Sequence, residues 1–225
     1  MPVNLRLLPS GGSDQNQLSR TFESLKYVLN SNDTFSGSHV LDARRLAVRI
    51  ANTANLPSNL TSALSLAGCL YDIGKLQVPA DLLVKQTPLT TREVTAIRRH
   101  VAAGYRMLRE GSLLADLDGD TKMLIYEVAL LHHERFDGTG YPLGFRGHEI
   151  PVLARIMAVA DSFAAMTAPR PYRPALSMQA ALEEIRRGSG RQFDPGFVRV
   201  LQELVVPAEE STEGWRGAEA EGGMR

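Results

Sequence analysis

The 225-residue chain has little of several features that would assign a protein to a class at once. Its formal net charge is zero, because 25 lysine and arginine residues balance 25 aspartate and glutamate residues. This balance argues against DNA binding, since proteins that bind nucleic acid carry an excess of basic residues. A single cysteine, Cys69, excludes an intramolecular disulfide and is typical of a reducing compartment.

Long apolar runs are also missing. No stretch is apolar over the length that a transmembrane helix needs, and the N-terminus has no apolar segment of signal-peptide length. We therefore expect a cytoplasmic protein that does not insert into a membrane.

Alternating patterns typical of β-strands are nearly absent. Apolar residues recur instead at helical spacing, and Thr90 with Glu93 resembles a helix-capping box. The pattern predicts an all-α bundle. The predicted helices cover residues 18–29, 40–54, 57–74, 90–108, 119–133, 151–166, 177–187 and 194–205.

The two ends of the chain lack this periodicity. Residues 1–17 carry proline, glycine, serine and asparagine with little pattern, and residues 207–225 are rich in glutamate and glycine. Such segments bury too little apolar surface to fold. We expect a flexible N-terminal segment over 1–17, one helical domain over 18–206, and a disordered tail over 207–225.

One internal segment also interrupts the helical pattern. Residues 134–149, "ERFDGTGYPLGFRGHE", hold four glycines and a proline, and they directly follow the adjacent histidines His132 and His133. A long loop inside a compact domain is usually functional.

Histidines and aspartates with metal-binding chemistry fall on apolar helices or at helix ends. Asp161 is the clearest example, because a carboxylate among apolar residues is costly to bury unless it is paired or bound to a metal. Imidazole and carboxylate groups suit Fe, Mn, Zn, Co or Ni. Spacing alone leaves two alternatives open, a metal centre and a set of hydrogen-bonded core side chains. The residues concerned are His39, Asp72, His100, His132, His133 and Asp161.

Four motifs in register make the sequence similar to a known family. "HHERFDGTGYP", "EIPVLARIMAVADSFAAMT", "RPYR" and "QFDP" resemble the HD-GYP family of metal-dependent phosphohydrolases over roughly residues 34–204. The resemblance implies a single HD-superfamily helical bundle with a metal centre in its core and a long GYP loop. It also implies hydrolysis of the bacterial second messenger cyclic-di-GMP by hydroxide attack at a two-metal site.

The resemblance assigns roles to individual residues. The implied ligands of one or two transition-metal ions are His39, Asp72, His100, His132, His133 and Asp161. The implied catalytic residues are Asp72 and Lys75. The implied substrate-binding residues are Lys75, Arg170, Arg173, Gly140, Tyr141 and Pro142. The last three form a loop that can also meet a diguanylate-cyclase-type or other signalling protein.

The chain departs from the family pattern beside the first metal site. Tyr71 replaces the histidine of the HD pair, and Ala164 and Pro169 stand where the family often has aspartate. A phenol, with an ordinary pKa of about 10, is a poor ligand until a metal deprotonates it. Two interpretations follow. The chain is a phosphodiesterase whose first metal site is weakened or uses Tyr71 as a replacement ligand, or it is a degenerate domain that binds cyclic-di-GMP or a partner protein without turnover.

Overall fold

Helices form every regular element that the structure describes. This computed structural model describes residues 37–169 and 174–205, without the side chains of residues 37–39 and 41. Within these ranges the β pairing is limited to one isolated bridge between Ser189 and Phe193. The predicted all-α class is confirmed. The predicted helix over 18–29 and both predicted tails lie outside the described residues.

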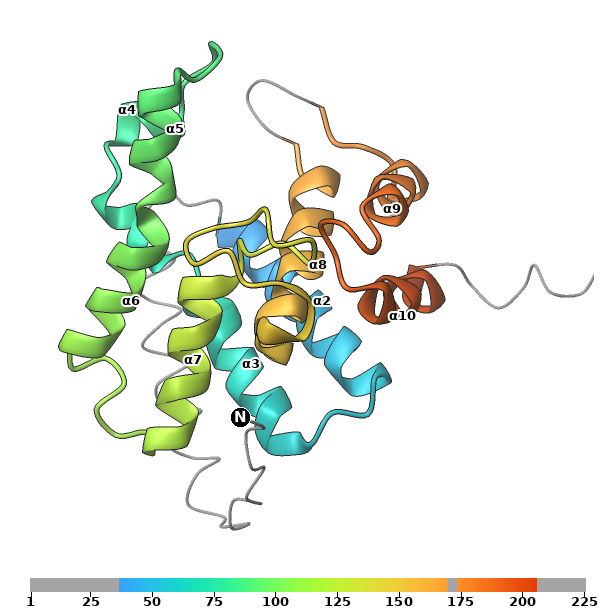
Figure 1. Cartoon of the computed structure of the whole chain (residues 1–225), viewed down its shortest axis with the longest axis horizontal. Coiled ribbons are helices and arrows are strands. Elements are labelled where there is room, and N and C mark those ends of the chain that lie inside the picture. The colour runs from blue at the N-terminus through green and yellow to red at the C-terminus, as the bar shows by residue number, and fades with distance from the viewer. Residues whose placement is uncertain (1–36, 170–173, 206–225) are drawn as a thin grey trace, which may run out of the picture.

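Four helices form the centre of the bundle (Figure 1): α2 (Gly37–Thr53), α3 (Ser58–Leu70), α7 (Gly119–Leu131) and α8 (Val152–Thr167). Helix α2 packs against α3 and α8, and α7 packs against α3 and α8 from the other side. The apolar stripe predicted for α2 faces this core, where Ala43, Ala47 and Ile50 are fully buried.

Shorter helices flank the centre on both sides (Figure 1). Helices α4 (Ala80–Leu83), α5 (Thr91–Arg98) and α6 (His100–Glu110) run along one edge, and α9 (Met178–Arg187) and α10 (Pro195–Val205) cover the other. The segment between α7 and α8, which contains the short 3₁₀ helix η2 (Gly147–Glu149), crosses the face between these two groups. It corresponds to the predicted loop.

Two predicted helices differ from the observed ones. The helix predicted over 90–108 is divided at Arg99 into α5 and α6, although the predicted capping box of Thr90 and Glu93 is present. The helix predicted to end at Gly74 ends at Leu70 and is followed by a 3₁₀ helix, η1 (Ile73–Gln77).

The 3₁₀ helix η1, which replaces the last predicted turn of that helix, packs closely against α6. A Cβ atom on Gly74 would lie 1.9 Å from the carbonyl oxygen of His100, so only glycine fits here. His100 begins α6 instead of lying in the middle of a helix, and Asp72 lies in the turn after α3.

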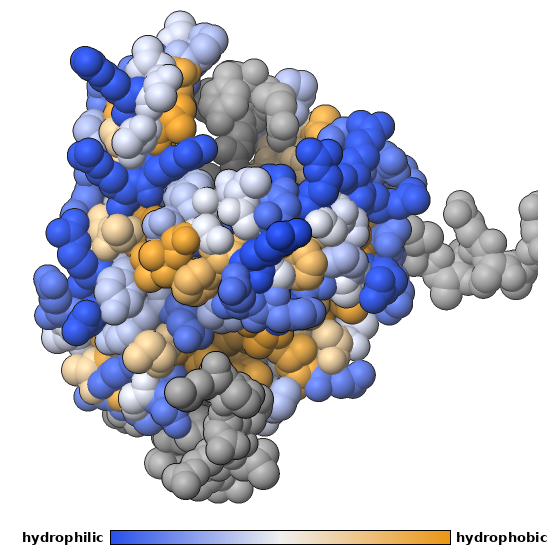
Figure 2. All heavy atoms as spheres, viewed as in Figure 1, coloured by the Kyte–Doolittle hydropathy of each residue, from blue (hydrophilic) through white to orange (hydrophobic). Residues whose placement is uncertain are grey.

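The surface is mixed in character (Figure 2). Hydrophilic side chains cover much of the visible face, and apolar side chains form smaller patches among them. Among the described helices, none combines the length and the apolar character that a membrane crossing requires.

Candidate metal centre

Four side chains from three separate elements meet in the core. Each of them offers one ligand atom, and these atoms all lie within 4.8 Å of one another. Asp72 comes from the turn before η1, His100 from the first residue of α6, and the adjacent histidines from the end of α7. We call Asp72, His100, His132 and His133 the His/Asp cluster.

Three atoms of the cluster are buried without a hydrogen-bond partner. The Nε2 atom of His100 lies 3.2 Å from Oδ1 of Asp72, and Nε2 of His132 lies 3.7 Å from the same oxygen. Neither contact has the geometry of a hydrogen bond, and all three atoms lack a hydrogen-bond partner among the described residues. Buried polar atoms without a partner are rare and need an explanation.

The other ring nitrogens of these histidines show which atoms carry lone pairs. Nδ1 of His100 is hydrogen-bonded to the carbonyl oxygen of Ile97 at 2.8 Å. Nδ1 of His132 is hydrogen-bonded to the carbonyl oxygen of Val128 at 3.0 Å. A carbonyl oxygen only accepts, so each Nδ1 is the donor and each neutral ring presents a lone pair at Nε2. Two imidazole lone pairs therefore face a carboxylate oxygen in the core.

A cation between these atoms would remove the conflict. Three imidazoles and one carboxylate are a ligand set suited to Fe, Mn, Zn, Co or Ni. Hydrogen bonds from Nδ1 to backbone carbonyls are also the contacts that usually orient metal-binding histidines. The residues of the His/Asp cluster therefore fit a transition-metal ion.

The electrostatics of the cluster favour the ligating forms of these residues. Burial tends to raise the pKa of Asp72, but the Lys75 ammonium holds that pKa well below its usual range. The Nζ atom of Lys75 lies 2.5 Å from Oδ2 of Asp72, which leaves Oδ1 directed at the histidines. Burial, followed by the proximity of His132, lowers the pKa of His133 well below its usual value and keeps that ring neutral.

Asp161 lies beside the cluster but does not belong to the set of four. Its Oδ1 atom accepts a hydrogen bond of 2.7 Å from the hydroxyl of Tyr71. Tyr71 is only 1% exposed, and its ring contacts the ring of His132 edge-on, with centroids 5.0 Å apart. A phenol thus fills the position of the family's histidine and is bonded to a carboxylate that the sequence predicts to be a ligand.

Other predicted site residues cannot be placed in the same way. The backbone of His39 lies in α2, but its side chain, like Arg170 and Arg173, is outside the described residues. Their roles stay predictions. Ala164 is buried in α8 and offers no ligand atom.

The loop residues Gly140, Tyr141 and Pro142 lie next to the histidine pair. The ring of Tyr141 stacks on the ring of His133, with centroids 4.9 Å apart and planes inclined by 22°. Burial raises the pKa of the Tyr141 hydroxyl. A Cβ atom on Gly140 would lie 2.3 Å from the backbone nitrogen of Arg135, so glycine is required for the loop to pack this closely.

Two residues near the site have no role in the sequence-based predictions. Glu134 is buried, and its carboxylate accepts backbone N–H groups of Leu143 at 2.6 Å and Gly144 at 3.1 Å. Arg98 places its guanidinium 4.8 Å from the centre of the Tyr141 ring. An acid at the start of a glycine-rich loop, whose amides need acceptors, was a usable signal for Glu134. The sequence held no such signal for Arg98, because the contact of Arg98 with Tyr141 depends on how α5 packs.

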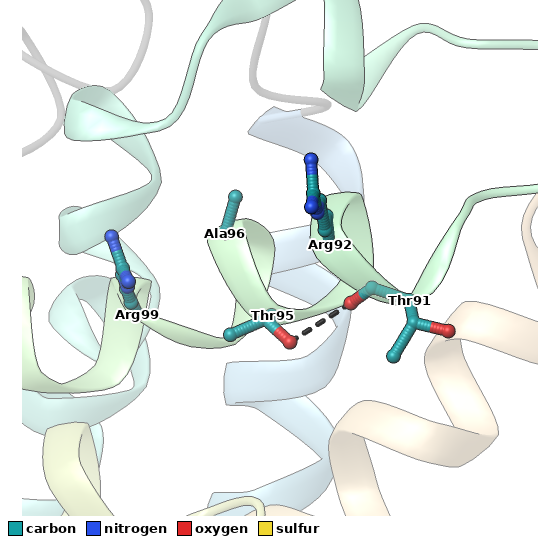
Figure 3. A pocket seen from close by; sticks show the side chains of 5 residues that line it. All are labelled: Thr91, Arg92, Thr95, Ala96 and Arg99. Atoms are coloured by element: carbon teal, nitrogen blue, oxygen red, sulfur yellow. Dashed lines mark hydrogen bonds between the residues drawn. The ribbon is translucent and has the colours of Figure 1, made fainter.

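A separate pocket of about 240 Å³ lies on α5 (Figure 3). It is lined by Thr91, Arg92, Thr95, Ala96 and Arg99. None of the residues predicted to bind metal or substrate lines this pocket, so it is distinct from the His/Asp cluster.

Comparison with known proteins agrees with the geometry. A family model described as "HD domain" matches residues 23–197. The chain is 34% identical over 188 residues to the "Cyclic di-GMP phosphodiesterase" of Thermotoga maritima, covering 83% of this chain and 49% of that protein. It is 31% identical over 168 residues to the "3'3'-cGAMP-specific phosphodiesterase 2" of Vibrio cholerae, covering 75% of this chain and 31% of that protein.

A solved structure shares the fold. Bd1817, an HDG"Y"P protein from Bdellovibrio bacteriovorus, aligns with a TM-score of 0.61 and 17% identity, over 84% of this chain and 59% of that chain. The chain spans about half or less of the length of the two curated relatives. The family model and these relatives show that the chain belongs to the HD domain family and, within it, to the HD-GYP proteins.

Proposed function

We propose that this domain is a metal-dependent phosphohydrolase that acts on or binds cyclic-di-GMP in the bacterial cytoplasm. The observation that carries the proposal is the His/Asp cluster, in which Asp72 Oδ1, His100 Nε2 and His132 Nε2 are buried without hydrogen-bond partners. The names of the relatives support a cyclic dinucleotide as the substrate class, since they include cyclic-di-GMP and 3'3'-cGAMP phosphodiesterases.

The chain's own residues suit phosphodiester chemistry. A bound transition metal would supply Lewis acidity, which activates water and neutralises charge on phosphoryl oxygens. Asp72, held ionised, would contribute the negative ligand, and the neutral imidazoles would complete the set. The Lys75 side chain is 30% exposed, so its ammonium lies where a phosphate oxygen can reach it. Arg170 and Arg173 are predicted to hold the same phosphate.

Tyr71 weakens the first of two metal sites in this proposal. The hydroxyl that donates to Asp161 is protonated, and a protonated phenol is a poor ligand. The hydrogen bond also engages an Asp161 oxygen that a first metal would need. His39 would remain as a ligand of the first metal. The His/Asp cluster would hold the second metal even if the first metal site were empty.

A second function is favoured by the same contact. If the first metal site does not form, the domain would be a catalytically inactive module that binds cyclic-di-GMP or a partner protein through the GYP loop. The exposed side chain of Leu143, 56% accessible, offers such a partner an apolar contact next to that loop.

The test combines metal analysis with turnover in one purified sample. The wild-type chain is loaded with Mn²⁺ or Fe²⁺ and incubated with cyclic-di-GMP, and with 3'3'-cGAMP in parallel, while chromatography follows the linear products. The matched control replaces both His132 and His133 with alanine. We expect at least one tightly held metal ion per wild-type chain, and loss of metal and turnover in the double variant.

The outcomes separate the two functions. Turnover that depends on the histidine pair establishes the enzyme. Calorimetric binding of cyclic-di-GMP without turnover establishes the binding module. Equal metal content in wild type and double variant would show that the His/Asp cluster is not the metal site.

A further inference from the structure

His133 differs from the other two histidines of the cluster in how its ring is oriented. The Nδ1 atoms of His100 and His132 are both bonded to backbone carbonyls. No hydrogen bond reaches either ring nitrogen of His133 within residues 37–169 and 174–205. Its ring contacts the rings of His132 and His100 within the cluster, with centroids 4.1 and 5.1 Å apart. From outside the cluster, the ring of Tyr141 stacks on it at 4.9 Å and an inclination of 22°.

Tyr141 is itself held from several directions. Its backbone N–H donates to the carbonyl oxygen of His133 at 3.3 Å. The backbone N–H groups of Leu143 and Gly144, which follow the GYP sequence, donate to the carboxylate of Glu134. These hydrogen bonds fix the end of the GYP sequence. The Arg98 guanidinium, 4.8 Å from the Tyr141 ring centre, adds a cation–π contact from α5.

Stacking sets the direction of a ring as a hydrogen bond does. Rotation of the His133 ring about its Cβ–Cγ bond would break the parallel contact with Tyr141 and turn its nitrogen away from Asp72. A ligand that is free to rotate must lose that freedom when a metal binds, and this loss lowers metal affinity.

We propose that Tyr141 is a positioning residue that orients His133 for metal binding, with Arg98 and Glu134 holding Tyr141 in place. The GYP loop then sets the metal affinity of the His/Asp cluster, in addition to any contact with substrate. The inference rests on the proposed function, because it requires that the cluster binds a metal.

The test measures metal affinity without substrate. Apo protein is titrated with Co²⁺ in competition with a chelator, and the visible absorption of bound Co²⁺ reports the coordination of the ion. Tyr141→Phe keeps the stacked ring and should bind Co²⁺ within about 2-fold of wild type. Tyr141→Ala removes the ring and should bind roughly 10–100-fold more weakly, the range typical for loss of a contact that orients a ligand.

Two further variants complete the experiment. Met123→Ala alters an exposed side chain of α7 that has no role in the site and should leave Co²⁺ affinity unchanged. Arg98→Gln alters an exposed side chain and should weaken binding by a few-fold, which keeps the proposal testable if Tyr141→Ala fails to fold.

The failures are distinguishable. Wild-type protein that binds no Co²⁺ would overturn the proposed metal site and this inference with it. Wild-type protein that binds Co²⁺ while Tyr141→Ala binds equally well would overturn the inference alone. If Tyr141→Ala does not fold, an unchanged Co²⁺ affinity in Arg98→Gln would overturn the inference alone.

Discussion

Tyr71 and Asp161 form the contact in which this chain departs most from the HD-GYP pattern. The phenol is buried beside His132, and its hydroxyl donates to Asp161 at 2.7 Å. Asp161 is partly buried, and its carboxylate gains a hydrogen-bond donor in Tyr71 without a metal. In the proposed metal site, this hydrogen bond would compete with the metal for the same oxygen.

Tyr71→His should restore a ligand at this position. If Tyr71 weakens the first metal site, the variant should bind more metal per chain. It should also hydrolyse cyclic-di-GMP at least about 10-fold faster, equivalent to about 1.4 kcal/mol in the activation barrier. Elemental analysis and a chromatographic rate assay on the same sample measure both quantities.

Tyr71→Phe is the matched control for this change. It removes the hydrogen bond to Asp161 but supplies no ligand, so any rise in metal content should be smaller than that of Tyr71→His. If Tyr71→His shows unchanged metal content and an unchanged or lower rate, the weakened-site hypothesis is wrong. Tyr71 would then be a working ligand, or the obstacle would lie at Ala164.

Helices and turns determine how close the ligands come to one another. Asp72 reaches His100 because the 3₁₀ helix η1 lies directly against α6, and glycines at positions 74 and 104 allow that contact. The spacing between the two elements therefore sets how close Asp72 and His100 lie in the His/Asp cluster.

Gly74→Ala should separate η1 from α6. The added methyl group would lie 1.9 Å from the His100 carbonyl oxygen and 2.4 Å from the Gly104 nitrogen, both backbone atoms. We expect a loss of about 1–3 kcal/mol in unfolding free energy, typical of overpacking, together with weaker metal binding. Denaturant unfolding and metal titration measure the two effects. Gly119→Ala, with no atom within 4 Å of the added group, should lower neither.

The start of α5 gives a prediction for pH. Glu93 accepts hydrogen bonds from Lys85 at 2.7 Å and from the backbone of Thr90, and these contacts lower its pKa from 4.5 to about 2. Because the folded-state pKa is depressed, the stabilisation by Glu93 is present above about pH 4.5. It is lost as the pH falls toward 2.

Glu93→Gln removes the charge but retains a side chain that can complete the capping box. Its melting temperature should be lower than that of wild type near neutral pH, and the difference should shrink as the pH falls below about 4.5. Thermal unfolding followed by circular dichroism over this pH range measures it. A difference that stays constant with pH would contradict the assigned role of the Glu93 charge.

The complete domain should respond to metal as one cooperative unit. Ligands of the His/Asp cluster come from the turn after α3 and from α6 and α7, so a bound ion would connect elements that are distant in sequence. Metal at about 100 times its Kd should stabilise the folded state by about 2.7 kcal/mol. For a domain of this size that corresponds to a rise in Tm of roughly 5–11 °C.

Differential scanning calorimetry with and without a chelator tests this expectation. The variant with both His132 and His133 replaced by alanine should show no metal-dependent rise. A rise of equal size in that variant would mean that the stabilising metal binds elsewhere.

Local sequence information was sufficient for the fold class and for most helices. Apolar spacing of three and four residues predicted the central helices, and the capping pattern of Thr90 and Glu93 predicted the start of α5. The division at Arg99 and the early end of α3 were not predictable. Both lie close to the place where η1 packs against the start of α6, and the residues that meet there are distant in sequence.

The same distinction applies to the site. Residue type and motif were enough to propose Asp72, His100, His132 and His133, because imidazole and carboxylate groups are the common ligands of transition metals. Packing between α3, α6 and α7 placed their ligand atoms within 4.8 Å of one another and left Asp161 bonded to Tyr71. The stack of Tyr141 on His133 and the hydrogen bonds of Glu134 arise from the path of the loop in space. Sequence spacing does not specify that path, because the loop's glycines permit many backbone conformations.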